Sequence, residues 1–145
     1  MDGLNSLECI VYCNFGTPGD SKTFECDNMC ELLIHHEVIL KIELINKSKD
    51  NLEDISISHI KRVGGIIPQD SILNDKGKVK YIYDSLKWKL ERLNIGEKAV
   101  LTFKYLIEDC TPFSLTPLKV SYDYSINNKY FGPYDSNKFK IICNR

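Results

Sequence analysis

Hydrophobic and polar residues alternate with a period of two through the middle of the chain, beginning at Leu86. Leu86, Trp88 and Leu90 fall on one face of an extended segment, with charged residues between them. Such a period predicts a β-strand with one dry face and one wet face. Trp88 is the only tryptophan of the chain. A large ring at the centre of a strand predicts a core that lies between two sheets.

A turn and a second strand follow this segment. Asn94–Glu97 is a polar stretch in which Gly96 supplies a positive φ at little steric cost. One face of the next segment is again apolar: Ala99, Leu101, Phe103, Tyr105 and Ile107. We therefore expect Leu101 and Phe103 to lie in the same core as Trp88.

The same alternation recurs along most of the chain. It predicts further strands over residues 6–15, 38–44, 52–58, 79–83, 118–124 and 139–143. Turn signals separate them at Gly16–Asp20, Lys47–Asn51, Asn74–Gly77, Asn127–Asn128 and Gly132–Pro133. Leu40 lies on the apolar face of the second of these strands. Roughly eight to ten short strands without a convincing helix predict an all-β protein with a β-sandwich fold.

One order of residues resembles a known repeat. Trp88, Leu93, Gly96-Glu97 and Leu101-Thr102-Phe103 resemble a repeat of bacterial cell-surface proteins, catalogued as "domain of unknown function 11". The strand that ends at Asn46 is similar to a strand of that family, which ends in Asn before a polar turn. The resemblance covers about residues 37 to 142. It implies an immunoglobulin-like, structural and non-enzymatic domain of a surface protein.

Length and charge narrow the class of protein. A chain of 145 residues forms one domain with a sizeable core. A net charge of -1 gives no long-range attraction to nucleic acid or to an anionic membrane. No apolar run approaches the ~20 residues of a membrane span. Residues 1–15 lack the basic and apolar regions of a signal peptide. We expect a protein made in a cytoplasm without a classical signal peptide.

Six cysteines are many for a chain of this length: Cys9, Cys13, Cys26, Cys30, Cys110 and Cys143. In a secreted protein they would predict disulfides, whereas a reducing cytoplasm would keep them as thiols. A protein made inside a cell and exposed when the cell lyses resolves this conflict. Components of a bacterial spore surface have that history.

The spacing of the first four cysteines leaves three interpretations open. Cys9-x3-Cys13 and Cys26-x3-Cys30 present two pairs of thiols, a set that holds Zn²⁺ in many proteins. Residues four apart on one strand lie ~13 Å apart, too far to bond each other, so each cysteine would need a separate partner. Disulfides to another arm or another subunit fit that geometry and are the interpretation we favour. The third interpretation is that the thiols pack in the core as small hydrophobic groups.

These observations lead to one functional hypothesis. Residues 1–34 are expected to form an N-terminal cysteine-containing arm, and residues 35–145 the sandwich domain. The arm would add a strand to the sheet edge of another copy, and disulfides would then lock a homopolymer. We expect a structural subunit of a bacterial surface or spore-appendage fibre, without catalytic residues, metal or cofactor.

Two alternatives remain at this stage. The first is a ligand- or glycan-binding adhesin that uses the Val63–Pro68 loop or a tyrosine patch of Tyr122, Tyr124, Tyr130 and Tyr134. The second is a cytosolic protein with a four-cysteine metal site. His35, His36 and His59 lack a nearby motif that supplies a nucleophile and an orienting carboxylate, so we expect no catalytic role for them.

Overall fold

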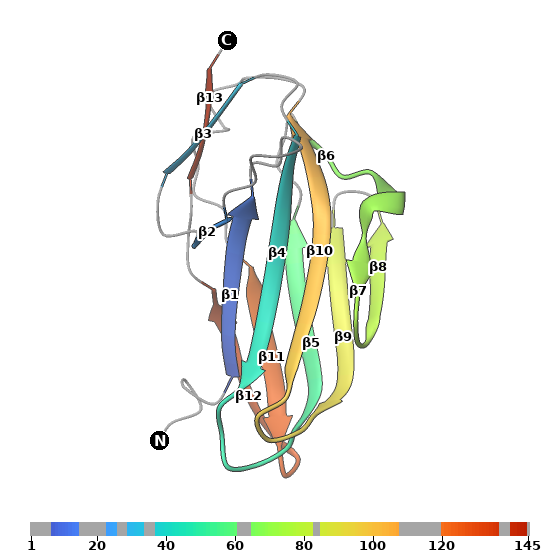
Figure 1. The fold of residues 1–145 in the computed structure, drawn as a ribbon. Coiled ribbons are helices and arrows are strands. Elements are labelled where there is room, and N and C mark those ends of the chain that lie inside the picture. Colours follow the sequence, from blue (N-terminus) through green and yellow to red (C-terminus); the bar gives the residue numbers. More distant parts are fainter. Residues whose placement is uncertain are drawn as a thin grey trace.

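The protein is a β-sandwich of two antiparallel sheets packed face to face (Figure 1), as predicted. The computed structural model describes residues 7–14, 23–25, 29–33, 37–60, 65–82, 85–107, 120–136 and 140–144. Outside the strands, these residues include one 3₁₀ turn, η2, at Gln69–Ser71.

Neighbouring strands in the first sheet follow the order β2-β1-β4-β10-β6, and β7 also pairs with β10. Their bounds are Leu7–Asn14 for β1, Thr23–Glu25 for β2, Glu37–Asn46 for β4, Gly65–Ile66 for β6, Leu73–Asn74 for β7 and Lys98–Ile107 for β10. The long strands β4 and β10 occupy the middle of this sheet.

The second sheet has the order β12-β11-β5-β9-β8. Its strands are β5 (Leu52–Ile60), β8 (Lys78–Ile82), β9 (Ser85–Leu93), β11 (Ser121–Ile126) and β12 (Lys129–Asp135). A separate pair consists of β3 (Met29–Leu33) and β13 (Lys140–Asn144), which run parallel.

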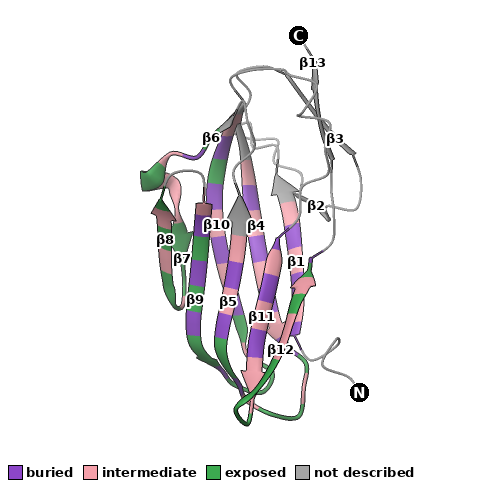
Figure 2. Ribbon diagram, turned by 180° about the vertical axis from the view of Figure 1, so that it is seen from behind, coloured by how far each residue is buried: buried purple, intermediate pink, exposed green. Residues whose placement is uncertain are grey.

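The core lies between the two sheets because each long strand buries alternate residues. Figure 2 shows this alternation as buried and exposed bands along β9. Leu40, Leu101 and Phe103 come from the first sheet and Trp88 from the second, and none is more than 1% exposed. The period of two in the sequence therefore places these four residues in one core.

The turns use residues that tolerate a left-handed backbone. Gly77 and Gly96 have φ values of 79° and 75°, and both lie in segments that the sequence predicted to be turns. Asn127 and Asn128 have φ values of 50° and 66° and join β11 to β12. Two consecutive residues of positive φ form the turn that matches the twist of a two-residue hairpin.

The Gly132–Pro133 prediction is wrong, because these residues lie inside β12 and not in a turn. They coincide with an irregularity in the pairing of β11 with β12, between Tyr122 and Tyr124. Strand β12 is the outer strand of its sheet. A proline lacks the backbone N–H, and an edge strand accepts one at a position that makes no ladder bond.

Candidate assembly strand and cysteine positions

Strand β1 belongs to the sandwich of its own chain. It pairs antiparallel with β4 at eight positions, from Leu7 opposite Asn46 to Asn14 opposite Ile39. Leu7, Cys9 and Val11 point into the core and are at most 6% exposed. This corrects the predicted boundary between residues 34 and 35, which would separate β1 from the core. Alternation identified the buried face of β1, but it carried no information about which strand would pair with it.

The other edge of β1 is only partly covered. Strand β2 pairs with it at Tyr12, Cys13 and Asn14. Among the described residues, no strand pairs with the outer edge of Leu7–Ile10. An uncovered edge presents backbone N–H and C=O groups to which a further strand can add. Glu8 lies on this edge and its carboxylate is 2.7 Å from the Lys47 ammonium, so a charged pair borders the open stretch.

Cys9 is a free thiol buried in the core. Burial raises the pKa of its thiol to about 12, because the thiolate would lose its hydration. A thiol held in the neutral form neither ligates zinc nor attacks a disulfide. With β1 in place, Cys9 therefore acts as a small hydrophobic group, which was the third of the three interpretations.

The remaining cysteines are placed only through the backbone or lie outside the described residues. Cys13 is opposite Leu40 on β4 and Phe24 on β2. Cys30 is opposite Ile141 and Cys143 is opposite Leu32, so the register of β3 and β13 offsets them by two residues. With the strand spacing and rise of a parallel pair, their Cα atoms lie roughly 8 Å apart, beyond the usual disulfide range. Cys26 and Cys110 are outside the described residues.

No group of three or more metal-binding side chains occurs within the described part of the chain. The four-cysteine site would require Cys9 to leave the core with the rest of β1. The burial of Cys9 therefore argues against this alternative.

Asn46 connects the start of β1 to two loops at one end of the sandwich. Its side chain is buried, and Nδ2 donates to the carbonyl oxygens of Asp50 at 2.9 Å and Leu93 at 3.0 Å. Its Oδ1 accepts from the Ser48 backbone N–H at 2.9 Å. Its backbone N–H donates to the Glu97 carbonyl at 3.1 Å. The sequence marked Asn46 only as the end of a strand; these long-range bonds explain why an amide, with donors and an acceptor, stands there.

The turn after β9 is held by the Glu97 side chain. Its carboxylate accepts from the Asn94 backbone N–H at 2.8 Å and lies 3.4 Å from the Lys76 ammonium. The hydrogen bond from Asn94 is the main cause that lowers the pKa of Glu97, with Lys76 adding to it. The Gly-Glu motif therefore closes the β9–β10 hairpin, and Lys76 ties it to the loop before β8.

The tyrosine patch expected on the surface is largely internal. Tyr124 is fully buried and Tyr122 is 8% exposed. Tyr134 packs against both, with ring centroids 5.7 Å from Tyr122 and 6.0 Å from Tyr124. Burial raises the pKa of Tyr122 to about 12. Of the four, only Tyr130 is an exposed side chain, so the patch is wrong as a binding surface.

The other expected positions contribute no described site. His35 and His36 lie outside the described residues, and the side chain of His59 is not described. Part of the Val63–Pro68 loop forms β6 against β10, and Ile67 is buried. No helix in the described ranges is long and apolar enough to cross a membrane.

Of three comparisons with known proteins, only the one with solved structures found matches, and it supports the β-sandwich fold. No family model matches the chain. No curated protein matches it either. Among solved structures, the chain is similar to the 35 kDa C-terminal fragment of the major pilin GBS80 of Streptococcus agalactiae. The TM-score is 0.60 at 9% identity, over 95% of this chain and 56% of that one.

The chain is also similar to two solved structures of proteins with other functions. The collagen-binding domain of a Staphylococcus aureus adhesin gives a TM-score of 0.53 at 10% identity, over 91% of this chain and 96% of that domain. A β-N-acetylglucosaminidase of Vibrio harveyi gives 0.50 at 9% identity over 97% of this chain. The chain spans only 18% of that enzyme's length. At these identities the likeness establishes the fold alone.

Proposed function

We propose that this protein is a structural, non-enzymatic subunit that assembles with copies of itself into a fibre on a bacterial surface. The observation that carries the proposal is strand β1, which completes the core, while no described strand pairs with part of its outer edge. The fold is also shared with a domain of a major pilin. We also propose that the chain is a member of the domain-of-unknown-function-11 family and that the fibre lies on the spore surface.

An exchange of β1 between copies accounts for assembly at low energetic cost. In a neighbouring sandwich, β1 would make the same eight pairs with β4 and bury the same three side chains. Domain swapping of this kind changes the connection and leaves the contacts of β1 with β4 unchanged. Residues 15–36 connect β1 to β4. They include β2 and β3, and if both were released from β1 and β13 the fully extended segment would span about 70 Å, enough to reach an adjacent copy.

Disulfides between copies are the second part of the proposal. Cys13 would accompany β1 into the neighbouring sandwich, and Cys110 and Cys143 supply further thiols. Oxidised fibres should resist detergent, and a reductant should weaken them, because a covalent bond blocks dissociation. Non-reducing gels that show only monomer would contradict this part and leave the strand exchange standing.

Strand complementation tests the exchange directly. A variant that lacks residues 1–14 loses three core residues and should not melt cooperatively by itself. A synthetic peptide of residues 5–15 should restore a cooperative melt, and an excess of it should block assembly of the full chain. The matched control is the same peptide with Val11→Asp, which places a charge in the core. If neither peptide affects folding or assembly, or both act equally, the proposed role of β1 is wrong.

A second candidate, an adhesin module, is supported by the likeness to the whole collagen-binding domain from S. aureus. The internal position of Tyr122 and Tyr124 removes one of its two expected ligand surfaces, and the Val63–Pro68 loop is the other. Ligand binding by the isolated monomer, measured without assembly, would favour this candidate.

A further inference from the structure

The outer face of the second sheet carries four lysines that oppose one another across β8 and β9. Lys78 is directly opposite Lys89, and Lys80 is directly opposite Lys87. Like charges directly opposite one another destabilise an antiparallel pair. Within the described residues none of the four forms an ion pair, whereas Lys41, Lys47, Lys76 and Lys98 all do. The fold thus holds four uncompensated cations together at some cost.

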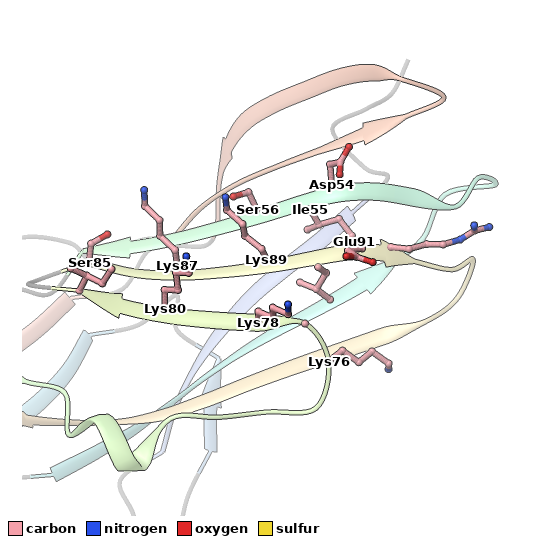
Figure 3. A pocket seen from close by; sticks show the side chains of 14 residues that line it. Asp54, Ile55, Ser56, Lys76, Lys78, Lys80, Ser85, Lys87, Lys89 and Glu91 are labelled. Atoms are coloured by element: carbon pink, nitrogen blue, oxygen red, sulfur yellow. The ribbon is translucent and has the colours of Figure 1, made fainter.

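These lysines line an open groove of about 1260 Å³. Figure 3 shows them side by side on the two strands, with Asp54 and Glu91 toward one end. The Cβ atoms of opposite residues lie about 5 Å apart, and residues two apart on one strand about 7 Å. The four lysine side chains therefore leave the sheet as two neighbouring pairs that follow each other along the groove. This geometry fits a linear polymer with repeated negative charges.

The end of the groove shows a strained backbone at Asp54. Its φ is 47°, in the left-handed region, where the pairing of β5 with β11 is irregular. Residues held in this region cost free energy and are often found where a side chain must be directed at a ligand. Asp54 lines the groove together with Ser56 and Glu91. Their oxygens can accept hydrogen bonds from hydroxyl groups, which a polyphosphate lacks.

We propose that the groove over β8 and β9 binds a linear anionic polysaccharide. Its sulfate or carboxylate groups would lie on Lys78, Lys80, Lys87 and Lys89, and its hydroxyl groups at the end formed by Asp54 and Glu91. The described lining residues include no aromatic side chain, on which the bases of single-stranded nucleic acid would stack. The site needs no assembly and no strand exchange, so it stands or falls independently of the proposed fibre.

A second copy of the chain is the main rival occupant. One pairing row of this sheet runs from Asp123 through Ser56 to Lys89, so an acidic and a basic residue lie on opposite sides of Ser56. That arrangement would allow copies to pack by charge. The concave surface fits a narrow linear polymer better than the edge of a second sandwich, and Asp54 and Glu91 at one end of the groove can accept hydrogen bonds from its hydroxyl groups.

Titration of the full chain with a heparin-derived decasaccharide tests the proposal by calorimetry. The double variant Lys80→Gln/Lys87→Gln should bind about tenfold more weakly, as expected for the loss of two exposed ion pairs. The control Lys49→Gln/Lys129→Gln changes the net charge equally on other loops and strands and should bind as the parent does. Added salt should weaken parent and control far more than the double variant. The urea midpoint of Lys80→Gln/Lys87→Gln should be no lower than that of the parent, because the two lysines repel each other, and this measurement checks that the variant is folded.

The variant Asp54→Gly distinguishes a polysaccharide from any other polyanion. It removes one negative charge, which repels both ligands, and one hydrogen-bond acceptor, which only heparin uses, so the affinity for inorganic polyphosphate should rise relative to the affinity for heparin. The proposal would be overturned if Lys80→Gln/Lys87→Gln and the control Lys49→Gln/Lys129→Gln bound heparin with equal affinity. So would polyphosphate or oligothymidylate binding as tightly as heparin. A double variant that altered only the sedimentation of the protein would assign the groove to a second copy instead.

Discussion

Replacing Gly77 with alanine probes the packing around the only tryptophan. A Cβ built on Gly77 would lie 2.4 Å from the Lys89 backbone oxygen and 3.0 Å from Nε1 of Trp88. That nitrogen now donates to the Lys76 carbonyl at 2.8 Å. Gly96 offers the matched control, because its φ is similar and nothing lies within 4 Å of its Cβ position. The two substitutions therefore share backbone strain and differ only in steric contact.

The structure gives different magnitudes for the two variants. A left-handed backbone costs an L-residue about 1–2 kcal/mol, so Gly96→Ala should lower the free energy of unfolding by roughly that amount. Gly77→Ala adds an overpacking term of about 1–3 kcal/mol. Moving the indole also leaves a buried N–H without its acceptor, at about 1–3 kcal/mol. We expect Gly77→Ala to lose about 2–6 kcal/mol more than Gly96→Ala.

Urea titration of the parent and both variants, followed by Trp88 fluorescence, measures this difference. Equal slopes of the free energy against urea would show that the unfolded states are comparable. If the two variants differed by less than about 0.5 kcal/mol, which is the range of ordinary surface changes, the packing of Trp88 against this turn would be wrong.

Three further substitutions test other parts of the sandwich. Trp88→Ala should lower the free energy of unfolding by about 3–5 kcal/mol in a urea titration, and a loss under about 1 kcal/mol would contradict its place in the core. Asn46→Ala should cost about 2–3 kcal/mol, since it leaves the Leu93 carbonyl buried without its donor; an unchanged midpoint would refute this role. Glu97→Gln should destabilise the protein above the usual carboxyl pKa. Because folding lowers the pKa of Glu97, this contribution is lost as the pH falls through the folded pKa, and thermal melts of variant and parent should converge in acid. A difference in melting temperature that persisted unchanged in acid would exclude the charge as its cause.

Alternation and turn chemistry predicted the local elements of this fold well. The period of two placed Trp88, Leu101 and Phe103 on the buried faces of β9 and β10. Gly96 and the Asn127–Asn128 pair also marked real turns, because few residues accept a positive φ. These features depend on neighbours in the sequence, which is why a single chain reveals them.

The errors concern contacts between distant segments. Strand β1 showed the correct dry face, but its pairing with β4 across the intervening residues was invisible in the pattern. The alternation over residues 118–124 places Tyr122 and Tyr124 on one face of a strand, and the packing of the second sheet buries that face, so grouping them with Tyr130 as a surface patch was wrong. The opposed lysines of β8 and β9 each follow a regular alternation, so the cation pairs appear only once the register is known.

Electron microscopy of the purified full chain tests the proposed assembly most directly. At increasing protein concentration we expect filaments with a regular repeat about the size of one sandwich, and their shortening when the peptide of residues 5–15 is present. A protein that stays monomeric at every concentration, with and without oxidant, would contradict the account.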